Sequence, residues 1–166
     1  MLEDPDVQLA RLENGQLPLE EQRSMTADLG LLEDKRSEEV LLSLLGNADP
    51  ITRYNAVTAL GFDRGVRSAA PLLRSMLADD PDEDCRGASA SALGQLLQNS
   101  NDSEAICSLA LAALNDPDEI VRRSAYKAAL IVRGISPEDH LALLRDESLT
   151  VDIERVRSWL SSGDRR

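Results

Sequence analysis

Apolar residues recur along most of the chain at intervals of three and four, which is the spacing of one face of an α-helix. The segments 38–45 (EEVLLSLL) and 70–77 (APLLRSML) show this spacing clearly. Each is followed by a short turn and then by a second run rich in alanine and leucine. The pattern predicts pairs of amphipathic helices, in which we name the first member the A helix and the second the B helix.

Asp-Pro steps mark the boundary between the two helices of three pairs. Aspartate is a favourable N-cap, and proline fits the first helical position because its φ angle is already set. We therefore expect B helices to begin at Asp49, Asp80 and Asp116. The predicted B helices cover residues 19–32, 50–62, 81–98, 117–133 and 149–160.

The B segments are copies of one another. DPITRYNAVTALG (49–61), DPDEDCRGASASALG (80–94) and DPDEIVRRSAYKAAL (116–130) align, and QRSMTADLG (22–30) is a weaker copy. Small residues stand three and six positions after the arginine of each of the three stronger copies, where they allow neighbouring helices to approach closely. Successive Asp-Pro prolines are 31 and 36 residues apart, and a period in the thirties predicts stacked helix pairs.

The motif Asp-Pro-Asp-x-x-Val-Arg-x-x-Ala-x-x-Ala-Leu-Gly resembles the HEAT-like repeat, in particular the short bacterial kind named after phycobilisome lyases. The resemblance covers about residues 38–133 and is best at 116–130. It implies an all-α fold, an α-α superhelix of about five antiparallel helix pairs forming a single domain over residues 1–166. We expect capping pairs at about 4–32 and 136–162 and repeats at about 37–62, 66–98 and 102–134.

The resemblance also implies a structural role for the repeated charged residues. In HEAT-like families the motif arginine commonly pairs with aspartates of adjacent turns, which forms a ladder along the stack. The corresponding residues here are Asp49, Arg53, Asp80, Arg86, Asp116 and Arg122. Anion binding by the same arginines is the less favoured interpretation.

Charge narrows the range of partners. The 166 residues include 18 Lys and Arg against 30 Asp and Glu, for a formal net charge of −12. Phosphate backbones and anionic bilayers repel such a chain, so we expect no nucleic-acid or membrane partner. The acidic start, MLEDPDVQLARLENG, differs from a signal peptide, and we expect a cytoplasmic protein.

Residues that could support catalysis or metal binding are few. His140 is the only histidine, and Cys85 and Cys107, which we expect to be small buried hydrophobic residues, match no zinc spacing. The acidic run at 79–84 lacks the glycine and glutamate that a calcium loop requires at its sixth and twelfth positions. We expect no catalytic residue, metal or cofactor.

A candidate binding stripe follows the repeat arginines. The positions one and five residues after each arginine lie on one side of the B helices, and Tyr126 lies beside them. These residues are Tyr54, Thr58, Gly87, Ser91, Arg123, Tyr126 and Lys127. They predict either an ordinary solvated face or a surface for a protein or peptide partner.

The preferred functional prediction is a monomeric, non-enzymatic interaction module that binds its partner through the concave B-helix face. An alternative from the resemblance is an accessory subunit in bilin attachment to, or removal from, phycobiliproteins. The shortness of the chain and its 2% aromatic content disfavour a pigment pocket. A HEAT-like DNA glycosylase is a third class, which the net charge disfavours.

Overall fold

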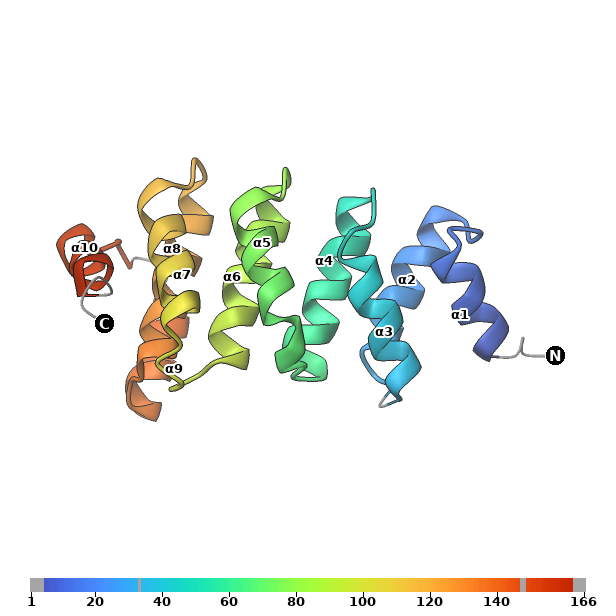
Figure 1. Cartoon of the computed structure of the whole chain (residues 1–166), viewed down its shortest axis with the longest axis horizontal. Helices are drawn as coiled ribbons and strands as arrows, with labels where there is room; N and C mark the ends of the chain where they lie inside the picture. Colours follow the sequence, from blue (N-terminus) through green and yellow to red (C-terminus); the bar gives the residue numbers. More distant parts are fainter. Residues whose placement is uncertain (1–4, 33, 147–148, 163–166) are drawn as a thin grey trace. The chain divides into compact units, whose positions relative to one another are not determined.

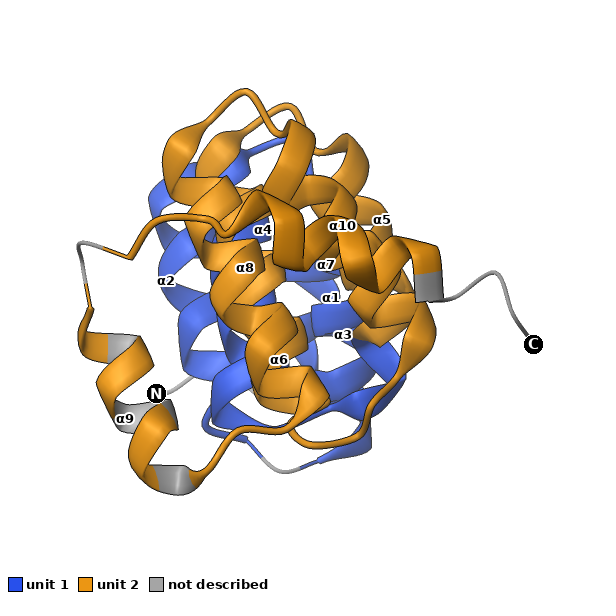
Figure 2. Ribbon diagram, turned by 90° about the vertical axis from the view of Figure 1, so that its left-hand side faces the viewer, with its two compact units in different colours: residues 1–69 blue, residues 70–166 orange. Residues whose placement is uncertain are grey.

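The computed structural model describes residues 5–32, 34–146 and 149–162, and every regular element within these ranges is helical (Figure 1). The all-α fold predicted from the sequence is confirmed. The chain forms two compact units, residues 1–69 and 70–166, each defined by the contacts among its own residues (Figure 2).

Unit 1 contains two helix pairs. They are α1 (Pro5–Glu13) with α2 (Leu19–Leu29), and α3 (Lys35–Leu44) with α4 (Pro50–Thr58). A π-helical turn, η1 (Ala59–Asp63), and a 3₁₀ turn, η2 (Arg67–Ala69), follow α4. The A helices pack on each other and so do the B helices, while α3 contacts both α2 and α4. This is the packing of stacked repeats.

Unit 2 contains two further pairs and the C-terminal helices. The pairs are α5 (Ala70–Asp79) with α6 (Glu83–Leu96), and α7 (Ser103–Asn115) with α8 (Glu119–Arg133). Again α5 packs on α7 and α6 packs on α8. The last two helices are α9 (Pro137–Arg145), which contacts α8, and α10 (Ile153–Ser162), which packs against α7.

The predicted stacking residues are buried. None of the six small residues is more than 2% exposed, and Leu60 and Leu93 are fully buried. At Gly94 a Cβ atom would lie 3.0 Å from the Cα and Cβ atoms of Ala128, so α6 and α8 touch almost backbone to backbone there. The six residues are Ala56, Ala59, Ser89, Ala92, Ala125 and Ala128.

The expected helix starts are correct at one Asp-Pro step and wrong at two. Asp49 caps α4 and Pro50 is its first residue. Helices α6 and α8 begin two residues later than Pro81 and Pro117, and their N-caps are Asp82 and Asp118.

The physical reason lies in the two additional residues before the arginine of these copies. Asp80 and Asp116 do not cap the helices. Instead, Oδ1 of Asp80 accepts a hydrogen bond from the Asp82 amide at 3.0 Å, and Oδ1 of Asp116 accepts one from the Asp118 amide at 2.9 Å. These bonds form Asx turns, which order the chain ahead of each helix.

The first copy contains the same turn in a different residue. The amide of Asp49 donates to Oδ1 of Asn47 at 2.9 Å, so Asn47 corresponds structurally to Asp80 and Asp116. Each repeat arginine then stands four residues after its N-cap. The arginines therefore give the correct alignment of the copies, whereas the Asp-Pro steps misalign the first copy by two residues.

The cysteine prediction is correct for Cys85, which is fully buried. It is wrong for Cys107, which is exposed. Cys107 lies on the same side of α7 as the exposed residues Glu104 and Leu111, three residues before it and four after, facing away from the core. The side chain of His140 lies outside the described residues.

Candidate interaction surfaces

One face of α4 and η1 exposes large apolar side chains. Ile51, Tyr54 and Phe62 are 46%, 43% and 46% exposed, and Thr58 is half-buried between them. Residues 51, 54 and 58 share a face by helical spacing, and the wide π-helical turn places residue 62 about one turn beyond 58. We name this set of four residues the α4 face.

Arg64 ties the end of the α4 face to the loop between α2 and α3, and its side chain is 8% exposed. Its guanidinium donates to the carbonyl oxygen of Leu32, and its Nη2 donates to the carbonyl oxygen of Asp34 at 2.9 Å. Nη2 also lies 3.6 Å from a carboxylate oxygen of Glu38. Phe62 is therefore presented by an anchored segment.

The rest of the predicted binding stripe lies in unit 2. Gly87 and Ser91 are half-buried on α6, and the Ser91 hydroxyl donates to the Gly87 carbonyl at 3.0 Å. Arg123 is half-buried on α8. Lys127 donates from Nζ to the Asp146 carbonyl at 2.6 Å, which fastens the end of α9 to α8.

Tyr126 is not a surface residue, contrary to expectation. It is 3% exposed because Trp159 of α10 stacks on it, with ring centroids 5.9 Å apart. The guanidinium carbon of Arg133 lies 5.1 Å from the indole centroid on α10. Tyr126 therefore fastens the C-terminal helix to unit 2 and is not available to a partner.

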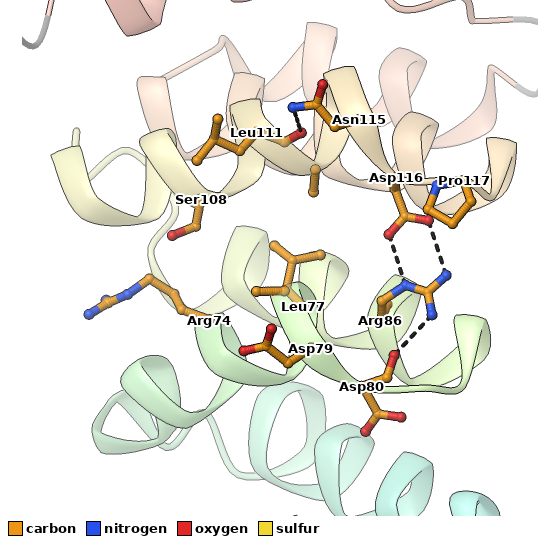
Figure 3. A pocket seen from close by; sticks show the side chains of 12 residues that line it. Arg74, Leu77, Asp79, Asp80, Arg86, Ser108, Leu111, Asn115, Asp116 and Pro117 are labelled. Atoms are coloured by element: carbon orange, nitrogen blue, oxygen red, sulfur yellow. Dashed lines mark hydrogen bonds and ion pairs between the residues drawn. The ribbon is translucent and has the colours of Figure 1, made fainter.

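Arg86 joins α6 to the turn before α8 (Figure 3). Its Nε and Nη2 donate to the two carboxylate oxygens of Asp116 at 2.8 and 3.1 Å, and the side chains are 11% and 5% exposed. Burial alone raises the pKa of Asp116, but hydrogen bonds from Arg86 and from the Asp118 amide outweigh it and hold the pKa below its ordinary value.

A second pair of this kind was missed in the sequence. Arg23 of α2 donates from Nε and Nη2 to Asp49 at 3.0 and 2.7 Å. This pairing, with help from the amide and hydroxyl of Thr52, holds the pKa of Asp49 well below its usual range. The signal was present in the weaker copy at 22–30, which places an arginine 30 residues before Arg53.

The repeat arginines also bind the turn that precedes their own helix. Nη1 of Arg53 donates to the carbonyl of Asn47 at 2.9 Å, and Nη1 of Arg122 donates to that of Asp116 at 2.7 Å. Nη1 of Arg86 donates to the carbonyl of Asp80 at 2.9 Å. Each arginine therefore helps to hold its own turn closed.

A groove of about 560 Å³ lies between the A helices α5 and α7. Figure 3 shows Arg86 and Asp116 at one side of it, Arg74 and Ser108 at the other, and Leu77 between them. The sequence did not predict this α5–α7 groove, because the repeat motif lies in the B helices. No helix in the described parts of the chain is long and apolar enough to cross a bilayer.

These features define a class of protein: an all-α repeat protein built from stacked helix pairs. The family of HEAT repeats matches residues 5–94, which is more than half of the chain, and the protein belongs to that family. No curated protein matches the chain. The match includes the N-terminal pair and ends in α6, although α7 and α8 continue the same packing.

Proposed function

We propose that the protein is a non-enzymatic interaction module that binds a partner protein through the α4 face. HEAT repeats generally serve as protein-interaction scaffolds. The observation that carries the proposal is the distribution of aromatic residues. Tyr126 and Trp159 are buried against each other, whereas Tyr54 and Phe62 are exposed on one face beside Ile51.

The chemistry of the α4 face favours an apolar or amphipathic partner segment. All four of its positions hold uncharged side chains. Aromatic residues supply large contact areas at a small cost in side-chain entropy and are enriched at binding hot spots. An apolar cluster of this kind on a water-exposed helix costs solubility unless a partner covers it.

The α4 face is also held rigidly, which favours binding. On the opposite side of α4, Ala56 and Val57 are fully buried. Arg23 binds Asp49, the N-cap of α4, and Arg64, just after η1, binds the carbonyls of Leu32 and Asp34. A surface that is already ordered loses little conformational freedom when it binds.

Site-specific photo-crosslinking tests the proposal. A benzophenone amino acid replaces Tyr54 in one protein and Val7, a 47% exposed residue of α1, in a control. We expect a partner to be captured from native lysate at position 54 and not at position 7. Capture of the same protein at both positions, or at position 7 only, contradicts the proposal.

The captured partner then allows a quantitative comparison. Tyr54→Ala should weaken its binding by roughly 30-fold, which corresponds to about 2 kcal/mol for a hot-spot side chain. Ile51→Ala should weaken binding, whereas Val7→Ala, which truncates an equally exposed aliphatic residue, should leave it unchanged. Equal affinities of Ile51→Ala and Val7→Ala would show that the face is wrongly chosen.

Several sequence predictions remain predictions. They are the continuity of the binding stripe from Tyr54 and Thr58 to Gly87, Ser91, Arg123 and Lys127, the accessory role in bilin chemistry, the monomeric state and the cytoplasmic location. Variants of unit 2 measure the first of these directly. If Arg123→Glu weakens capture as much as Tyr54→Ala does, the partner spans both units.

A further inference from the structure

We propose that the α5–α7 groove is a second docking site, separate from the α4 face, and that it receives a peptide segment of a partner protein. The segment carries a lysine or arginine next to an aliphatic residue. The proposal rests on the shape, the apolar lining and the charge of the groove.

The groove is preformed because α5 and α7 pack on each other, and two ion pairs bridge its walls. Nη2 of Arg74 on α5 lies 2.6 Å from a carboxylate oxygen of Glu104 on α7, which joins the two helices directly. Arg86 and Asp116 join α6 to the turn after α7. An incoming segment therefore need not open the groove, which reduces the cost of binding.

Aliphatic side chains line the middle of the groove. Leu77 and Ala78 contribute from α5, and Leu111, which is 48% exposed, contributes from α7. The polar residues of α7 in the lining bond to their own helix: Ser108 donates to the Glu104 carbonyl and Asn115 to the Leu111 carbonyl, each at 3.0 Å. Contact with an aliphatic side chain of the partner is therefore favourable at this place.

The groove is not a site for an anion. All three nitrogens of Arg86 donate within the protein, two of them to Asp116 and one to the Asp80 carbonyl. Arg74 is neutralised by Glu104. An acidic ligand would meet two cations whose charges are already compensated.

A cation is attracted instead. The exposed Asp79 lines the groove, and the first turn of α6, outside the lining, adds the exposed carboxylates of Glu83 and Asp84. A lysine or arginine side chain can lie with its aliphatic stem along the exposed Ala78 and Leu111 while its charged head reaches Asp79. Charge complementarity with this acidic end selects such a segment over an acidic one.

Selection from a library of random twelve-residue peptides displayed on phage, with the full chain immobilised, tests the proposal. We expect enriched peptides to share a lysine or arginine beside leucine, isoleucine, valine or methionine. The most enriched peptide is then synthesised and its affinity measured by fluorescence anisotropy in 150 mM salt. A consensus without a cationic residue, or an acidic consensus, overturns the proposal.

Two matched pairs of variants locate the binding. Asp79→Lys should weaken the peptide at least tenfold, whereas Asp28→Lys, which reverses another exposed aspartate on α2, should change its affinity less than twofold. Leu111→Ser should weaken binding, whereas Leu72→Ser, at an equally exposed leucine of α5 outside the groove lining, should not. Equal effects within either pair overturn the assignment.

A further variant separates this site from the α4 face. Tyr54→Ala should leave the affinity of the peptide unchanged. If Tyr54→Ala abolishes binding while Leu111→Ser does not, the α4 face selected the peptide, and the groove is not the docking site. Circular dichroism at 222 nm establishes that every variant is folded.

Discussion

Replacing Arg86 by alanine removes the pair that joins α6 to the next repeat. The substitution removes two hydrogen bonds to Asp116, at 2.8 and 3.1 Å, and one to the Asp80 carbonyl, at 2.9 Å. The Asp116 carboxylate, only 5% exposed, then stays charged without its cation. Because alanine is a good helix former, α6 itself is not weakened.

The expected loss follows from that stranded charge. Removing one partner of a fully buried ion pair costs roughly 3–5 kcal/mol. Arg86 and Asp116 also line the groove, where water reaches their edges, so we expect a smaller loss of about 2–3 kcal/mol. Asp116→Asn keeps one oxygen as the acceptor for the Asp118 amide, but it removes the charge and replaces the other oxygen that accepts from Arg86 with an NH2 donor. The double variant should lose less than the two single variants together, by about 1–2 kcal/mol.

Urea unfolding followed by circular dichroism at 222 nm measures these differences. The control is Arg157→Ala, because Arg157 and Glu154 form a pair at 3.2 Å whose side chains are 65% and 87% exposed. Such a surface pair contributes less than about 1 kcal/mol. If Arg86→Ala and Arg157→Ala shift the unfolding midpoint equally, or if the double variant is additive, the pair does not stabilise the stack.

Because the pKa of Asp116 is lowered in the folded state, the unfolded chain binds more protons. The free energy of unfolding therefore falls as the pH drops from about 4 through the folded pKa. Asp116→Asn should flatten that decline in urea titrations at pH 2–6. Gly94→Ala should lower the melting temperature, because overpacking against α8 costs about 1–3 kcal/mol. Gly87→Ala should raise it, because its Cβ would lie 3.9 Å from Cγ2 of Val121, an ordinary contact, and alanine adds about 1 kcal/mol of helix propensity. Asp118→Ala should lose about 1 kcal/mol with the N-cap, and Glu119→Ala less than about 0.5 kcal/mol, in urea unfolding.

The candidate site was only partly predictable from the sequence. Tyr54 and Thr58 were identified because helical spacing from Arg53 places them on one side of the B helix. Phe62 was missed because the predicted stripe included only the positions one and five residues after each arginine, and Phe62 stands nine residues after Arg53. The α5–α7 groove was missed because its lining comes from α5, α7 and two turns, which packing brings together.

The paired-helix architecture and the stacking face were predictable from the sequence. Both depend on regular spacing within single helices: apolar residues at i, i+3 and i+4 set the buried side, and small residues after each arginine set the close approach of neighbours. The burial of Ala56, Ser89 and Ala125 shows how strongly such local periodicity constrains the fold.

The contacts between distant segments were not predictable, because they depend on how the helices pack within each unit. Arg23 binds Asp49, and Arg86 binds Asp116. The two aspartates occupy different positions in their repeats, because Asp49 is a helix N-cap and Asp116 belongs to an Asx turn. Tyr126 is buried because Trp159 returns to stack on it. Side-chain spacing along a helix fixes which residues share a face, but the segment that covers that face is selected by packing across the whole unit.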